Sequence, residues 1–437
     1  MLEDPLSVDR LVRDVSRSLQ SFRGALREGR GNDHAFDLAG RKISRELLQT
    51  LADAKGDPLA PALLRAAHRL YEARALAELE HEHAAALRLE RHALDDPERG
   101  RFTLATLLSR ALADGTGRRS AFLRALTERG THASDLVLRR AERHAELRAS
   151  LAKVVPATID LPGEAALELA PAVLSHTSDA YRALDPQSLA DVLELGLGRN
   201  SRASWPARLT ARSIAELFDD APWLAHVTPA PFAVPPALGA SSFLRALFAF
   251  GASLRAALAS TTEPFALARD PYGLERATFG ALLALLPTKE SFARRRLGVA
   301  QSGLSDHRRS IARVLLVTLR ERALRVTLRA PALSGGNDLL RAYPELAEQA
   351  LGIELHPSLL GALFTPRSGD TQHLAALPLA AALDRYLTDA HDDDWFRNPR
   401  ALEELRESAR GPAATEADQE ALTQGTTLLT SWLVESL

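Results

Sequence analysis

The chain has 437 residues, with 54 basic and 56 acidic side chains and no cysteine. Balanced charge and an aromatic content of 5% argue against nucleic-acid binding, which needs a basic surface and aromatic stacking platforms. The lack of cysteine excludes disulfides, thiolate metal sites, iron–sulfur clusters and cysteine nucleophiles.

The N-terminal segment, MLEDPLSVDRLVRDV, carries acidic residues early and has no apolar core of signal-peptide length. No later segment has about 18 uninterrupted apolar residues, the length that a membrane-spanning helix needs. We therefore expect no membrane association and a cytoplasmic protein.

Apolar residues recur at spacings of three and four along most of the chain, and Gly, Pro and Asp interrupt this pattern. Such periodicity is typical of packed amphipathic helices. Strand-like alternation is scarce, so we predict an all-α fold, a large helical body with a central cleft and very little β structure. The predicted helices cover residues 7–27, 36–54, 60–94 (one helix or two), 102–128, 134–153, 188–196, 210–218, 240–260, 274–286, 306–328, 337–351, 373–390, 399–409 and 416–434.

Two stretches lack the helical period. Residues 224–240, LAHVTPAPFAVPPALGA, are rich in proline, which fixes φ and removes a donor, so we expect an extended segment. Residues 154–171, VVPATIDLPGEAALELAP, are the predicted boundary between an N-terminal helical domain, 1–155, and a second helical domain, 156–437.

One helix has a group of possible metal ligands. Glu78, His81 and Glu82 share a helix face, and Glu-x-x-His is half of a di-iron motif. A second such helix is required, and AERHAELRAS, which contains His144, has the wrong spacing. A solvated, charged helix face is therefore the preferred interpretation.

Two further clusters allow a catalytic or a structural interpretation. Asp306 could orient His307 as a base with Arg308 nearby, but a helix cap followed by a surface face is the more common role of such a cluster. In HDDDWFRNPRALEEL, Asn398 followed by Pro399 favours a helix cap over a metal site. Gly-x-Ser-x-Gly, Walker and dinucleotide motifs are absent from the sequence.

The segment SSFLRALFAFGASLRAAL, residues 241–258, predicts a helix with two unlike sides. Phe243, Leu247, Phe250, Gly251, Leu254 and Leu258 fall on one broad apolar arc. The opposite side holds Arg245, Ala249, Ala252 and Ser253, and Phe248 lies at the border. Small residues on that side indicate that something lies close to it.

This part of the chain resembles the thimet-oligopeptidase and oligoendopeptidase family of zinc metallopeptidases, in particular its compact bacterial members. In that family a proline-bearing segment leads into a helix with His-Glu-x-Gly-His, and a later helix supplies a third zinc ligand. PFAVPPALGASSFLRALFAFGASL resembles the first helix, and RATFGALLALL resembles the second. The stretch WFRNP, from Trp395, resembles a C-terminal family motif, and His373 stands for a tyrosine that faces substrate in active members.

The resemblance implies that the metal site is lost. It places Phe248, Ala249 and Ala252 at the His, Glu and His of the motif, and Phe279 at the third ligand. Neither Phe nor Ala has a lone pair for zinc, so we expect no metal, no cofactor and no peptide hydrolysis.

Three functions remain open. The first is a catalytically inactive binding or partner subunit for a peptide or protein, such as an active peptidase paralogue, either alone or within an oligomer. The second is a metal-independent enzyme on a small apolar substrate, for which the candidate cavity groups are Arg276, Asp306, His307, Asp370 and His373. The third is a helical scaffold without a ligand.

Overall fold

The computed structural model describes residues 4–30, 34–54, 56–93, 101–113, 116–155, 163–198, 205–206, 209–218, 239–268, 273–367, 369–410 and 418–437. Within these ranges the chain is almost entirely helical, and the predicted all-α class is confirmed. The exception is a two-stranded antiparallel ribbon of β1 (His92–Ala93) and β2 (Arg101–Phe102). No helix in the described ranges is long and apolar enough to cross a membrane.

The chain forms two compact units, and the order of the sequence is not the order of the units. The first unit contains residues 1–161, 264–267 and 324–368, and the second contains 162–263, 268–323 and 369–437. The two units are defined by the contacts within each of them and combine separate segments of the chain. The predicted division into two domains at residue 155 therefore stays a prediction.

The first unit is built on the long helix α8. This helix contacts α4 and α5 from the first segment of the unit and α18, α19 and α20 from its last segment. Its core includes Val12, Phe22, Phe36, Leu48 and Leu63, all buried. The helices with their bounds are α1 (Pro5–Arg27), α2 (His34–Gly40), α3 (Arg45–Asp53), α4 (Ala60–Ala75), α5 (Ala77–Arg88), α6 (Leu104–Ala113), α7 (Thr116–Arg129), α8 (Thr131–Leu151), α18 (Arg329–Ser334), α19 (Gly336–Leu351) and α20 (Leu360–Leu363).

Backbone approach and side-chain hydrogen bonds hold α8 to α20. A methyl group on Gly361 would overlap the backbone of Ala133, so only glycine allows this contact. The Ser134 hydroxyl donates to the Ser358 carbonyl at 2.8 Å and accepts from the Gly361 N–H at 3.0 Å. In the same unit, buried Asp9 of α1 accepts from the N–H groups of Phe265 and Ala266, both at 2.8 Å, at the start of α14 (Phe265–Ala268).

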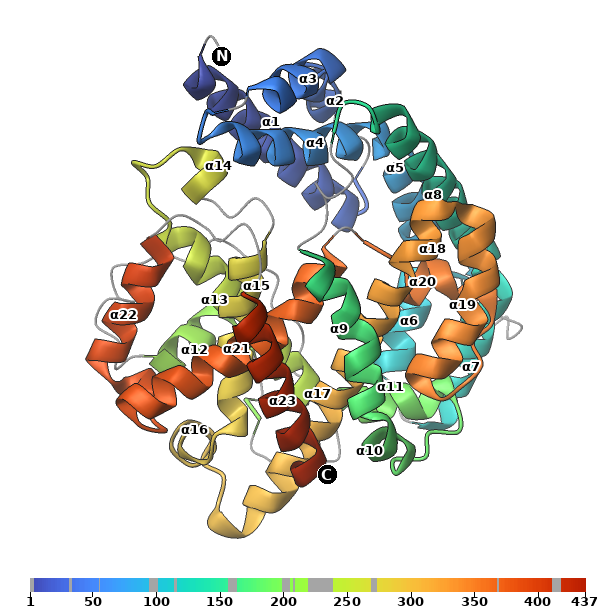
Figure 1. The fold of residues 1–437 in the computed structure, drawn as a ribbon. Helices are drawn as coiled ribbons and strands as arrows, with labels where there is room; N and C mark the ends of the chain where they lie inside the picture. Colours follow the sequence, from blue (N-terminus) through green and yellow to red (C-terminus); the bar gives the residue numbers. More distant parts are fainter. Residues whose placement is uncertain are drawn as a thin grey trace. The chain divides into compact units, whose positions relative to one another are not determined.

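The second unit has α13, α15, α21 and α23 packed on one another, α15 lying against both α13 and α21, and α21 against α23 (Figure 1). Its helices are α9 (Gly163–His176), α10 (Ser178–Arg182), α11 (Leu189–Leu197), α12 (Ala211–Ala215), α13 (Ala240–Leu258), α15 (Leu274–Leu285), α16 (Glu290–Arg296), most of α17 (Leu304–Thr327), α21 (Asp370–His391), α22 (Pro399–Arg410) and α23 (Gln419–Ser436).

Two glycines bring α13 and α15 together. A methyl group on Gly251 would overlap the carbonyl oxygen of Phe279, and one on Gly280 would lie 2.7 Å from the Phe248 carbonyl oxygen. Near the crossing, the Arg255 guanidinium bonds the Glu275 carboxylate, with Nε at 2.9 Å. Arg255 follows Gly251 along α13 whereas Glu275 precedes Phe279 along α15, so the two helices run antiparallel. Bulkier residues at either glycine would separate them.

The predicted helices correspond in part to the observed ones. The run at 60–94 is two helices, α4 and α5, which is one of the two alternatives expected. The runs at 36–54 and 102–128, each predicted as one helix, are two helices apiece, α2 with α3 and α6 with α7. The predicted boundary segment contains most of α9, which continues through Pro171, and the short helices α10, α16, α18 and α20 were not expected. The proline-rich segment predicted to be extended lies outside the described residues except at its last two positions, and the central cleft stays a prediction.

Candidate functional site

Helix α13 presents two unlike faces. On one side Phe250 and Leu254 are buried. On the other side Phe248, Ala249 and Ala252 are partly exposed, and Arg245 is exposed. These four residues recur at spacings of three and four, which places them on one stripe of the helix. We call the stripe of Arg245, Phe248, Ala249 and Ala252 the open face, and the side with Phe250 and Leu254 the closed face.

The closed face is filled by aromatic and aliphatic side chains. Phe250 stacks on Phe218 with ring centroids 5.4 Å apart, and Phe279 is only 7% exposed. The residual cavity is about 20 Å³, room for about one water molecule, and the groups around it are apolar. The lining residues are Phe218, Phe250, Leu254, Phe279, Leu282, Leu283, Trp395, Phe396, Leu402 and Leu405.

A partly buried ionic network contacts the aromatic wall of this cavity. The Trp395 indole N–H donates to Asp384 at 2.8 Å, and the Lys289 ammonium lies 3.2 Å from both Asp384 and Asp393 and donates to Thr388 at 2.8 Å. Burial raises the pKa of Asp384, while the charge of Lys289 and the indole hydrogen bond act in the opposite direction. The Trp-Phe-Arg-Asn-Pro stretch thus has a packing role here.

The open face lies beside polar groups from two other helices. The rings of Phe248 and His373 meet edge to face with centroids 6.0 Å apart. The Arg322 guanidinium carbon lies 5.5 Å from the centre of the Phe248 ring, and an Arg322 N–H donates to the His373 carbonyl at 2.8 Å. Two residues predicted to share a site, Phe248 and His373, are therefore brought together.

Phe279 is not brought together with Phe248. Its side chain lies on the closed face with Phe250 and Leu254, whereas the α15 residue in contact with the Phe248 ring is Gly280. Three of the predicted former metal-site positions, Phe248, Ala249 and Ala252, thus share a face, and Phe279 belongs to the opposite one. The close approach of the helices at Gly251 and Gly280 fixes the rotation of α15 about its axis, and this rotation turns Phe279 toward the closed face.

The remaining predicted residues lie in different places. His307 is buried at 3% exposure, its ring Nε2 donates to the Pro287 carbonyl at 2.9 Å, and burial lowers its pKa. Asp306 is exposed and pairs with Arg309 at 3.6 Å, so Asp306 does not orient His307. Asp370 is buried in the first turn of α21, the helix that also carries exposed His373. Arg276 is partly exposed on α15.

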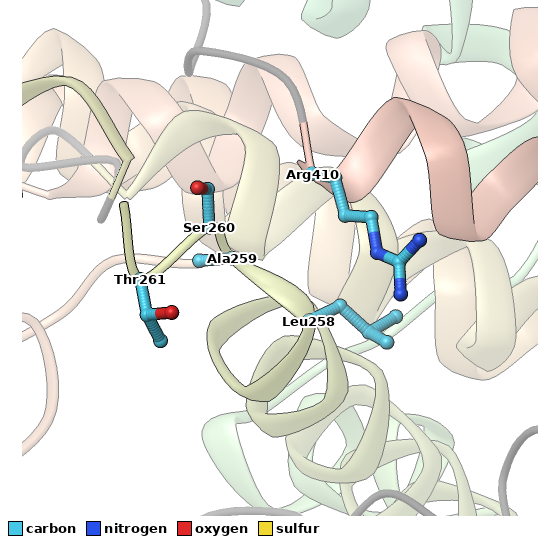
Figure 2. Close-up of a pocket in the computed structure, with 5 residues that line it drawn as sticks. All are labelled: Leu258, Ala259, Ser260, Thr261 and Arg410. Carbon is cyan, nitrogen blue, oxygen red and sulfur yellow. The ribbon is translucent and has the colours of Figure 1, made fainter. Parts of the chain in front are cut away.

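A second cavity, of about 320 Å³, lies where α13 ends (Figure 2). Leu258, Ala259, Ser260, Thr261 and Arg410 line it, and Figure 2 shows the Arg410 side chain extending toward Leu258. The Ser260 oxygen already accepts from the N–H groups of Thr262 and Glu263, which leaves it little capacity for a ligand. None of Arg276, Asp306, His307, Asp370 and His373 lines either cavity.

The charged helix face at residues 78–83 is mostly structural. Glu82 pairs with Arg139 at 3.2 Å, and His83 Nε2 donates to the Gly361 carbonyl at 2.9 Å. Sequence reasoning missed that His144 bonds Glu72 at 2.7 Å, a pair formed between α8 and α4. In the part of the chain that the structure describes, no three His, Asp or Glu side chains are grouped so as to hold a metal ion.

No protein-family model and no curated protein matches the sequence. Among solved structures, a carboxypeptidase from Pyrococcus furiosus matches 99% of this chain and 98% of its own, with a TM-score of 0.50 and 12% sequence identity. Oligoendopeptidase-F from Enterococcus faecium matches 99% of each chain, with a TM-score of 0.47 and 11% identity. The match to the carboxypeptidase shows that this chain shares the helical fold of that protein.

Proposed function

We propose that this chain is a catalytically inactive protein with a metallopeptidase-like fold that binds a peptide or a protein partner. The observation that carries the proposal is the open face of α13, where Phe248 and Ala252 stand one helical turn apart on a partly exposed stripe. Histidines at this spacing would chelate a metal ion, and Phe and Ala provide no donor atom. A glutamate is also missing at Ala249, so no side chain there can activate water.

Binding without catalysis accounts for a partly exposed aromatic ring better than a packing role does. A side chain kept only for the core would be buried as Phe250 and Phe279 are. Partly exposed aromatic rings beside polar groups are enriched at protein interaction sites. The partner in this proposal is a peptide or a second protein, including a catalytically active peptidase paralogue or another subunit of an oligomer.

A ligand-free helical scaffold is the competing proposal, and the nearly filled cavity beside Phe279 favours it. Incubation of the purified protein with a defined peptide mixture, followed by gel filtration and mass spectrometry, separates the two. We expect intact peptides to elute with the protein. A scaffold would retain none of them, and cleaved peptides formed in a chelator-insensitive reaction would support a metal-independent enzyme instead.

A further inference from the structure

We draw no further inference here: the strongest candidate, the exposed surface patch of Thr423, Gln424, Thr427, Ser431 and Val434 along α23, is uncharged, and nothing in the structure shows what covers it.

Discussion

The two faces of α13 differ although they belong to one helix of 19 residues. On the closed face Phe250 and Phe279 pack into an apolar interior with a cavity of about 20 Å³. On the open face Phe248, of the same residue type, is partly exposed beside Arg322 and His373. Residue type alone therefore does not distinguish a core position from a surface position in this segment; the side of the helix on which a residue falls decides.

The largest expected effect separates two phenylalanines that the sequence alone treats alike. Phe279→Ala should lower the free energy of unfolding by about 3–5 kcal/mol, because it enlarges a buried cavity that cannot collapse fully. Phe248→Ala should cost no more than about 1 kcal/mol, since that ring is partly exposed. Urea unfolding followed by tryptophan fluorescence measures both. Equal losses of unfolding free energy in the two variants would contradict the distinction between the open and closed faces of α13.

The next largest effect on stability is expected from a substitution in the ionic network behind the closed face. Lys289→Met leaves Asp384 with less compensation for burial and should cost about 2–3 kcal/mol. The control is Arg385→Met, which breaks an exposed pair with Asp389 on the same helix as Asp384 and should cost less than about 0.5 kcal/mol. If the midpoint temperature of thermal unfolding shifts equally in the two variants, the ionic network does not stabilise the aromatic wall.

The smallest expected effect concerns two histidines, buried His307 and exposed His373, and their contributions to stability. Because burial lowers the folded-state pKa of His307, the unfolded chain binds more protons, and stability should fall as the pH drops below about 6.5. His307→Gln, which can still donate to the Pro287 carbonyl, should reduce that loss between pH 7 and 5.

The exposed His373 provides the comparison on the open face. His373→Gln should change the free energy of unfolding less than His307→Gln does, because the His373 side chain is exposed whereas that of His307 is buried. Denaturation curves collected across the pH range decide the matter. An equal change in both variants would contradict the different burial of the two rings.

Much of the fold could be predicted because helical periodicity is a local property. The spacing of apolar residues located α13, α15 and α21 to within a few residues, and Asn398 caps α22 as expected, with its side chain accepting from the Arg400 N–H at 3.0 Å. Helix α9 was missed because residues 154–171 were interpreted as a boundary between two domains, whereas the helix begins at Gly163 and continues through Pro171.

The site could be predicted only in part, since the contacts between helices depend on their relative rotation. Arg245, Ala249 and Ala252 lie on the side that the periodicity assigned to them, but Ser253 is buried, with its hydroxyl bonded to the Phe250 carbonyl at 2.8 Å. The 27-residue separation of Ala252 and Phe279 was compatible with a shared site. The crossing at Gly251 and Gly280 instead turns Phe279 to the closed face, which no spacing along the chain reveals.

The zinc content of the purified protein decides whether this chain lacks a metal site. After zinc loading and exhaustive dialysis, elemental analysis should find no stoichiometric metal in the natural chain. The Phe248→His/Ala249→Glu/Ala252→His variant, which recreates the His-Glu-x-Gly-His pattern on the open face, should retain up to about one zinc per chain. One tightly held zinc in the natural chain would contradict the proposed loss of the metal site.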